Sequence, residues 1–194
     1  MLSLFHTSHQ IIKQPDVHFG RSNADFGQGF YLSDSHEFAG KWATPGKDGF
    51  TYINCYTLEP DGLKVKSFDI SSEWFEYIKA NREGRRDSLS DFDVVIGPVA
   101  NDTLFDTYGI LTSGLIKPED ALKLLSVGKN YRQINIKSKA AAAKLKWLKS
   151  ERLEREELEK SRELLLKESE QYTELFFGEL MKLPDFADIE DMLT

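Results

Sequence analysis

Two glycines, placed two and four residues after an aspartate, run directly into an aromatic strand in the segment Asp25–Ser33, DFGQGFYLS. A backbone that needs two such permissive residues beside an aromatic pair is pressed against something flat or crowded. A tight turn that enters a hairpin would need the same residues, so the segment alone leaves both interpretations open. Its neighbours favour the first, because a strand ending at His6 precedes it and a helix carrying a second large aromatic residue, Trp42, follows it.

The rest of the pattern mixes short strands and helices without a regular strand–helix–strand repeat, which indicates an α+β fold rather than a doubly wound parallel sheet. Strands are predicted over residues 2–6, 29–33, 50–58, 63–68, 92–97 and 131–137. Helices are predicted over residues 36–44, 71–82, 101–108, 111–115 and 118–127. The turn Pro60-Asp61-Gly62 predicts that 63–68 is the hairpin partner of 50–58. The strand at 131–137 is predicted to be the last one, with Ile134 and Ile136 facing one way.

The C-terminal quarter differs in composition from the rest. Residues 139–182 contain no proline and one glycine, and they are rich in Ala, Leu, Glu, Lys and Arg, which predicts one long helix. Residues 149–194 hold 7 of the 25 basic and 14 of the 32 acidic residues, so the preceding part is neutral, with 18 of each. We therefore expect two units, a globular domain over 1–147 and a charged helical extension over 148–194.

The expected extension has two kinds of surface. Between residues 149 and 163 only Leu153 and Leu158 are apolar, so this part is expected to project into water. Further on, an apolar stripe is formed by Leu165, Tyr172, Phe176 and Leu180. The stripe would suit an arm that binds a partner protein or a second copy of the chain, and it would equally suit a helix that folds back on its own domain.

Composition also limits the class of protein. The neutral charge of the first 148 residues gives no electrostatic case for general nucleic-acid binding. Cys55 is the single cysteine, so no disulfide within the chain is expected, and a buried thiol in a reducing, cytoplasmic compartment fits it best. We expect no signal peptide, because the N-terminus has no basic segment followed by an apolar stretch. No apolar run approaches the roughly 20 residues needed to span a membrane.

The motifs LFHTS and DFGQGFYLSDSHEFAGKWA resemble a known enzyme core. They are similar to the nucleotide-binding core of ADP-ribosyltransferases of the poly(ADP-ribose) polymerase and diphtheria-toxin type. They are closer still to a bacterial family with the pattern LYHGS…DFGKGFYLT…QAxxWA. The likeness to that family covers residues 3–147 and includes the run DFDVVIGPVAND and the strand near Gln133. It implies an ADP-ribosyltransferase-like mixed or antiparallel split sheet with flanking helices.

The resemblance implies that the protein binds NAD as a substrate and transfers single ADP-ribose units to a macromolecule, protein or nucleic acid. Tyr31 and Trp42 would sandwich the nicotinamide ring, each contact contributing about 0.5–2 kcal/mol. His6 would hydrogen-bond ribose hydroxyls, and the backbone at Thr7 would hold the nicotinamide amide. Ordinary core packing is the alternative role for both aromatic residues.

Four further positions complete the set that the resemblance implies. Gly27 and Gly29 would let the chain pass close to the cofactor, and Arg21 would meet a phosphate, although a plain surface position would equally explain that arginine. The third catalytic position of the family is usually glutamate and is Gln133 here. Glutamine keeps a hydrogen bond but brings no charge, which disfavours chain-building polymerase activity. The open alternatives are mono-ADP-ribosyl transfer, as in a toxin of a toxin–antitoxin or defence system, and a silent NAD- or ADP-ribose-binding module.

Other polar residues have weaker functional interpretations. Asp102 would serve as a helix cap or as a general base, and Asp93 lies within a buried strand. His9, His18 and His36 have no metal-ligand spacing, so no metal site is expected. A third interpretation treats the whole domain as a scaffold whose partner, such as an antitoxin, binds residues 149–194.

Overall fold

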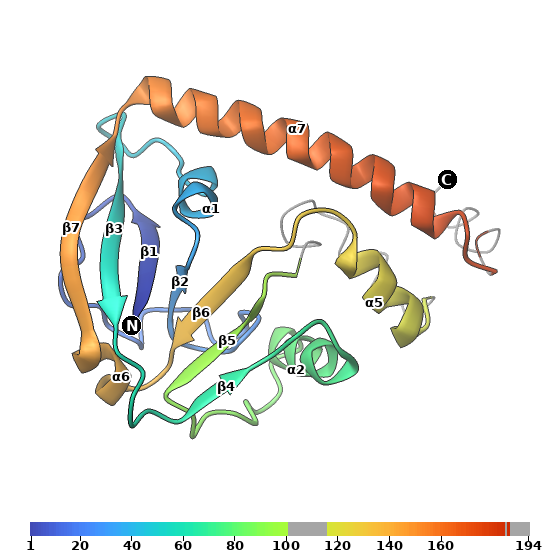
Figure 1. Ribbon diagram of the computed structural model, residues 1–194, viewed down its shortest axis with the longest axis horizontal. Coiled ribbons are helices and arrows are strands. Elements are labelled where there is room, and N and C mark those ends of the chain that lie inside the picture. The colour runs from blue at the N-terminus through green and yellow to red at the C-terminus, as the bar shows by residue number, and fades with distance from the viewer. Residues whose placement is uncertain (101–115, 185, 187–194) are drawn as a thin grey trace.

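A seven-stranded mixed sheet organises the chain in the computed structural model, which describes residues 1–100, 116–184 and 186 (Figure 1). Its order is β4-β5-β6-β2-β1-β3-β7. The strands are β1 (Leu2–Ser8), β2 (Phe30–Ser33), β3 (Thr51–Leu58), β4 (Val65–Ser67), β5 (Val94–Pro98), β6 (Arg132–Ile136) and β7 (Leu145–Leu153). The helices are α1 (His36–Lys41), α2 (Ser72–Arg82), α5 (Pro118–Ser126), α6 (Lys139–Lys144) and α7 (Arg155–Leu180). The predicted α+β class is confirmed.

The sheet is nearly divided in two between β1 and β2. β1 pairs with β3 over its whole length, from Leu2 to Ser8, whereas it pairs with β2 at one position, Phe5 with Ser33. β2 turns instead to β6, with which it pairs over all four of its residues. The result is two half-sheets, β4-β5-β6-β2 and β1-β3-β7, whose directions diverge in Figure 1.

Local signals in the sequence place most elements correctly. The side chains of Ser35, Ser71 and Ser138 each accept a hydrogen bond from the first turn of the helix that follows, as N-caps do. Pro118 opens α5, where its missing N–H costs nothing. In β6, Ile134 and Ile136 face one way into a core shared with strands β1, β2, β3 and β5. The alternation predicted for this strand is confirmed.

The predicted hairpin between residues 50–58 and 63–68 is wrong. β4 covers only Val65–Ser67 and pairs parallel to β5, not to β3. Both edges of β3 are already occupied, one by β1 and the other by β7. The chain therefore crosses from one half-sheet to the other after the Pro60–Gly62 turn.

The predicted long C-terminal helix is confirmed as α7, but its start is wrong, since residues 139–154 are not part of it, and 131–137 is not the last strand. α6 ends at Lys144, β7 follows, and α7 begins only at Arg155. β7 is a full edge strand that pairs with β3 from Leu58 to Thr51, with a register shift at Cys55/Tyr56. Residues 149–153, expected to project into water as part of a helical extension, thus belong to the sheet, and the expected boundary at 147–148 falls inside β7.

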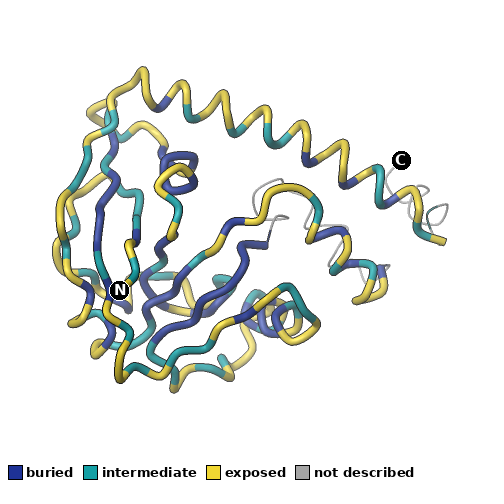
Figure 2. Tube along the Cα trace, in the orientation of Figure 1, coloured by how far each residue is buried: buried dark blue, intermediate teal, exposed yellow. Residues whose placement is uncertain are grey.

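α7 packs back on the domain rather than standing free. Its first buried residue is Leu158, and Tyr172, Phe176 and Leu180 join the core formed with α2 and α5. Near its middle, Glu168 forms an ion pair of 2.5 Å with Lys41, whose side chain is 2% exposed. Figure 2 shows most of the helix exposed, with intermediate and buried positions recurring along it. Of the two roles left open for the stripe, folding back is the one observed.

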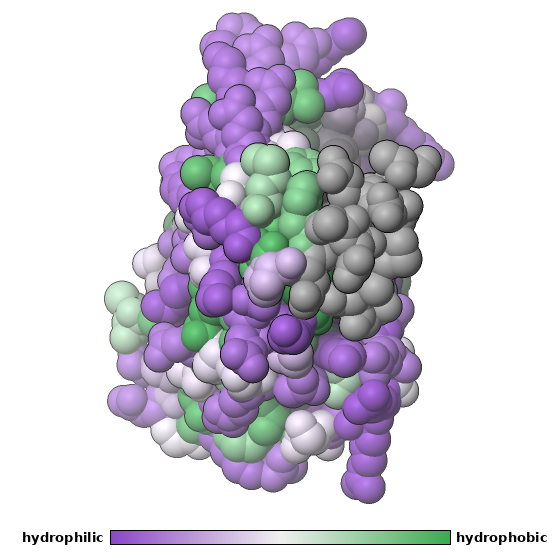
Figure 3. Space-filling model, turned by 90° about the vertical axis from the view of Figure 1, so that its right-hand side faces the viewer, coloured by the Kyte–Doolittle hydropathy of each residue, from purple (hydrophilic) through white to green (hydrophobic). Residues whose placement is uncertain are grey.

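The predicted helices at 101–108 and 111–115, together with Asp102, lie outside the described residues, as do residues 185 and 187–194. Figure 3 views the end of the molecule that carries α5 and the C-terminal end of α7, where hydrophilic side chains cover most of the described surface. In the described ranges, no helix is both long and apolar enough to cross a membrane.

We expect Phe176→Ala to lower the free energy of unfolding by about 3–5 kcal/mol, because a fully buried aromatic side chain would leave a cavity between α7 and the domain. Leu175→Ala is the matched control, since Leu175 is 50% exposed one residue away and its truncation should change stability by less than about 0.5 kcal/mol. Urea unfolding measures both. Equal effects of the two substitutions would contradict the packing of α7 described here.

Candidate functional site

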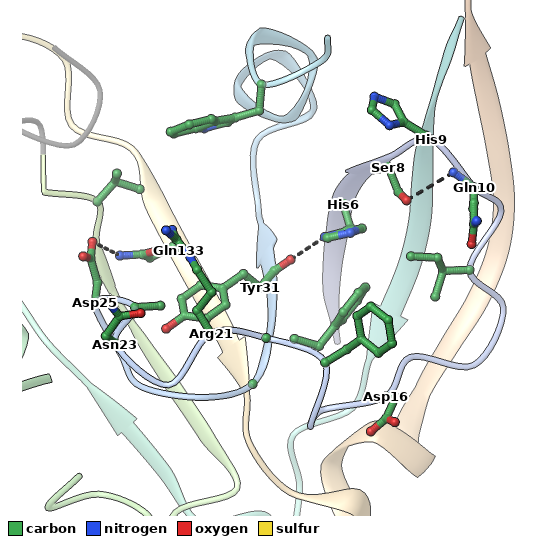
Figure 4. A pocket seen from close by; sticks show the side chains of 18 of the residues that line it. His6, Ser8, His9, Gln10, Asp16, Arg21, Asn23, Asp25, Tyr31 and Gln133 are labelled. Carbon is green, nitrogen blue, oxygen red and sulfur yellow. Dashed lines mark hydrogen bonds between the residues drawn. The ribbon is translucent and has the colours of Figure 1, made fainter. Parts of the chain in front are cut away.

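A pocket of about 1190 Å³ is lined by residues of both half-sheets, at the place where β1 and β2 separate. It is larger than the roughly 300–1,000 Å³ of most ligand pockets. His6 comes from β1, Tyr31 from β2, Gln133 from β6, and Trp42 directly follows α1. The sheet thus brings these four predicted residues, separated in sequence, to one cavity (Figure 4).

The other predicted residues divide between the pocket and its support. Arg21 and Gly29 also line the cavity. Gly27 and Thr7 lie outside the lining, and the Thr7 hydroxyl donates a hydrogen bond to the carbonyl oxygen of Ala39 in α1. Thr7 therefore ties β1 to the helix that carries Trp42.

His6 crosses the opening between the half-sheets. Its Nδ1 lies 2.7 Å from the carbonyl oxygen of Tyr31, and because that oxygen can only accept, Nδ1 carries the proton. Burial lowers the pKa of His6 below its ordinary value of 6.5, against the opposing effect of this hydrogen bond. A neutral imidazole protonated at Nδ1 leaves the Nε2 lone pair as an acceptor for a ligand hydroxyl.

The hydroxyl of Tyr31 is held by the turn that precedes β2. It donates to the carbonyl oxygen of Gly27 at 2.7 Å and accepts from the backbone N–H of Phe26 at 2.9 Å. Burial raises the pKa of Tyr31 well above its usual value, so the phenol stays neutral. Both of its polar contacts are with the protein, which leaves the ring as its contribution to the pocket wall.

At both glycines of this turn, neighbouring side chains of the protein leave no room for a Cβ atom. Gly27 has φ 73°, a left-handed conformation that favours glycine, and a Cβ there would overlap the carboxylate of Asp87. A Cβ on Gly29 would overlap Oδ1 of Asn135, which is fully buried and donates from Nδ2 to the carbonyl oxygen of Phe26 at 2.9 Å. The close approach expected from the sequence is present, and its cause is the packing of the turn against β6.

Trp42 is anchored through α1. Phe38 stacks on Tyr131 at 4.1 Å between ring centroids and makes an edge contact with Trp42 at 5.9 Å. Lys41 donates to the hydroxyl of Tyr131 at 2.5 Å and to Glu168 of α7. Burial alone would lower the pKa of Lys41, but its hydrogen bonds hold it above the usual range. Trp42 itself is 46% exposed, so it is a pocket wall and not a core residue.

Gln133 is joined to a carboxylate that the sequence analysis did not select. Its Nε2 donates to Oδ2 of Asp25 at 3.0 Å, and Nε of Arg82 donates to Oδ1 of the same carboxylate at 2.7 Å. All three residues line the pocket. The signal for Asp25 was its place at the head of the glycine segment, whereas nothing in the sequence connects Arg82 of α2 to it.

The remaining candidates have structural partners. His9 lines the pocket and lies 3.1 Å from the carbonyl oxygen of Thr44, while His36 contacts Glu151 at 2.6 Å. Cys55 is buried, and burial raises the pKa of its thiol. Among the described residues, no group of three or more His, Cys, Asp or Glu side chains could hold a metal ion.

Asp93 ties β5 to neighbouring segments. It accepts hydrogen bonds from the backbone N–H of Lys64 at 2.8 Å and from the hydroxyl of Ser138 at 2.5 Å. The Ser138 bond is the first cause of a pKa held below the usual range for this carboxyl. Asp93 therefore has a structural role at the base of the sheet.

Gly29→Ala should lower the free energy of unfolding by about 1–3 kcal/mol, because the new methyl group would overlap the buried side-chain oxygen of Asn135. Gly178→Ala in α7 is the control, since nothing lies within 4 Å of a Cβ there and the substitution should raise stability by up to about 1 kcal/mol. Thermal and urea unfolding report both changes. A Gly29→Ala protein as stable as wild type would contradict the packing of the turn on Asn135.

The lowered pKa of His6 predicts a loss of stability on acidification. In the unfolded chain His6 takes up a proton near pH 6.5, whereas in the folded protein it stays neutral to a lower pH. Through this residue, the free energy of unfolding is therefore constant above pH 6.5 and falls as the pH drops below it. His6→Asn retains an N–H donor for the Tyr31 carbonyl but does not titrate. Urea unfolding at pH 7.5, 6.5 and 5.5 should show a steeper loss in wild type than in the variant, and parallel losses would show that His6 is not shielded.

Comparison with known proteins places the chain in a family. A family model described as "Protein of unknown function (DUF3990)" matches residues 2–147. No curated protein and no solved structure matches the chain. The matched region begins with β1 and ends within β7, so it contains the first six strands and the residues that line the pocket. The protein therefore belongs to the DUF3990 family.

Proposed function

We propose that this protein is an NAD-dependent mono-ADP-ribosyltransferase. The observation that carries the proposal is the convergence of His6, Tyr31, Trp42 and Gln133 on one large pocket at the split of the sheet. These are the residues at which the sequence resembles the ADP-ribosyltransferase core, and they come from four different elements. A split sheet with flanking helices is also the architecture that this resemblance implies.

The chemistry suits the side chains that face the pocket. The bond between ribose C1′ and the nicotinamide nitrogen breaks, its electron pair leaves with the nicotinamide, and the ribose becomes an oxocarbenium ion. A nucleophile of the acceptor then gives an electron pair to C1′ and releases its proton to water. The rings of Tyr31 and Trp42 would hold the nicotinamide, which is cationic before the bond breaks. The neutral His6 would accept a hydrogen bond at Nε2 from a ribose hydroxyl.

The acceptor in this proposal is a macromolecule, protein or nucleic acid, outside the protein itself. Arg21 lines the pocket next to the glycine turn, where a guanidinium would meet a phosphate of the dinucleotide. The nucleophile would approach the open side of the cavity. A toxin of a toxin–antitoxin or defence system is the setting that the family resemblance suggests.

One observation favours a second candidate function, a pocket that binds NAD or ADP-ribose without cleaving it. Gln133 stands where the ADP-ribosyltransferase pattern has a glutamate, and an amide cannot offset the charge that develops on the ribose as a carboxylate does. The two candidates differ in one product. A transferase releases nicotinamide, whereas a silent binding module only retains the dinucleotide.

Binding of NAD by the purified protein tests what both candidates share. We expect saturable binding in calorimetry, accompanied by quenching of the fluorescence of Trp42. Trp42→Ala removes one ring from the sandwich and should raise Kd roughly 2- to 30-fold, the equivalent of about 0.5–2 kcal/mol, while Trp42→Phe should retain most of the affinity. Because this side chain is 46% exposed, neither change should unfold the protein.

Trp147→Phe is the matched control, since Trp147 lies in β7 outside the pocket lining and donates its indole N–H to Ser150. Its replacement should leave Kd and the quenching by NAD unchanged. Folded wild-type protein that shows neither NAD binding nor release of nicotinamide would contradict both candidate functions.

A further inference from the structure

Asp25 places a carboxylate in the pocket with each oxygen engaged by a different partner. Oδ1 accepts from Nε of Arg82 at 2.7 Å, and Oδ2 accepts from Nε2 of Gln133 at 3.0 Å. The side chain of Asp25 is 11% exposed and that of Arg82 is 13% exposed. Figure 4 shows the Asp25 carboxylate directed at the end of the Gln133 side chain.

We propose that Asp25 is the positioning residue of the site, which orients the amide of Gln133 and supplies the negative charge that glutamine lacks. The proposal rests on the proposed function, because it assigns a role in the binding and cleavage of NAD. It concerns a residue that precedes β2, whereas the carboxylate in the family pattern lies on the strand that carries Gln133.

The orientation follows from hydrogen-bond capacity. A carboxylate only accepts, so Gln133 must present its NH₂ group to Asp25. Its Oε1 is then turned away from Asp25, as an acceptor for a ribose hydroxyl. Without the carboxylate the amide could rotate and offer a donor in place of an acceptor. Arg82 prevents Asp25 itself from rotating, because it holds the second oxygen.

The charge of Asp25 acts within the same cavity. Burial is the largest cause of the raised pKa of Tyr31, and the charge of Asp25 raises that pKa to a lesser degree. The carboxylate therefore acts electrostatically on Tyr31, the residue proposed to hold nicotinamide. In a partly desolvated site a negative charge stabilises an oxocarbenium ion more than it would in water. Arg82 offsets part of this charge from the Oδ1 side, while Gln133 lies on the Oδ2 side.

A glutamate in place of Gln133 would be unfavourable so close to Asp25. A glutamate at this position would put a second carboxylate about as far from Asp25 as the amide is now, and like charges this close do not both remain ionised. One carboxylate and one amide make the same hydrogen bond without that repulsion. The pair therefore behaves as one unit in which the charge could sit at either position.

An exchange of the two side-chain types tests this unit. In Asp25→Asn the charge is gone and one oxygen remains. While that oxygen accepts from Arg82, the new NH₂ group faces Gln133, whose amide must rotate to accept from it and then presents a donor to the pocket. In the double variant Asp25→Asn, Gln133→Glu, the new amide can accept from Arg82 and donate to the new carboxylate, so both hydrogen bonds return with the charge moved to β6. Asp91→Asn is the control, because it removes an aspartate that is ion-paired with Lys64 outside the pocket lining.

We expect Asp25→Asn to lower kcat for nicotinamide release about 10- to 100-fold, with the loss falling on kcat more than on KM. The double variant should recover kcat to within about fivefold of wild type, and Asp91→Asn should match wild type. Thermal unfolding checks that each variant is folded. If wild type binds NAD without cleaving it, the same comparison is made on Kd, which should rise about fivefold or more in Asp25→Asn and return in the double variant.

Three results would overturn the proposal. Asp25→Asn with wild-type kinetics or Kd would show that Asp25 has no part in the site. A folded double variant as impaired as Asp25→Asn would show that the amide and the carboxylate do not act as an exchangeable unit. Wild-type protein that neither binds nor cleaves NAD would remove the proposed function together with this inference, whereas the first two results leave the proposed function standing.

Discussion

β1 and β2 are joined by one residue pair, Phe5 with Ser33, and the pocket exists because the two strands separate beyond it. A continuous antiparallel ladder would satisfy the backbone groups at this edge. Here the side chain of His6 crosses the gap and bonds the carbonyl oxygen of Tyr31 instead. One contact therefore bridges the two half-sheets, sets the tautomer of a buried imidazole and fixes the backbone of the aromatic residue beside it.

Polar side chains outside the pocket lining hold the walls of the pocket in place. Asn135 and Lys137 both donate to the carbonyl oxygen of Phe26, at 2.9 and 2.6 Å, and so hold the glycine turn against β6. On the other side, Lys41 connects α1 to Glu168. Glu168 lies beyond the region that matches the family model, so α7 stabilises the helix that carries Trp42 from outside that region.

Much of the fold could be predicted where a local pattern decides the structure. The alternation in Arg132–Ile136, the serine caps and the glycine–aromatic segment each act within a few residues, and each describes an element that is present. Leu145–Leu153 could not be predicted in this way. Its residues favour a helix, and its strand conformation comes from pairing with β3, which lies far earlier in the chain.

The residues of the candidate site also divide into those that a local pattern could predict and those that only the fold brings together. Its aromatic and histidine residues belong to short motifs, and they lie together in one pocket. The link from Asp25 to Arg82 spans 57 residues and to Gln133 spans 108, and no pattern in the sequence joins them. What the sequence suggested as a missing charge at Gln133 is, in three dimensions, an amide hydrogen-bonded to a carboxylate.

We propose that this pocket binds NAD and that the protein transfers the ADP-ribose unit to a macromolecule. The most direct test is to incubate the purified protein with a cell lysate and NAD labelled in the ADP-ribose half, while free nicotinamide is measured in the same tube. We expect nicotinamide release together with label attached to a macromolecular fraction, both lost in His6→Ala. Folded wild-type protein that releases no nicotinamide and labels no fraction would contradict the claim of transfer.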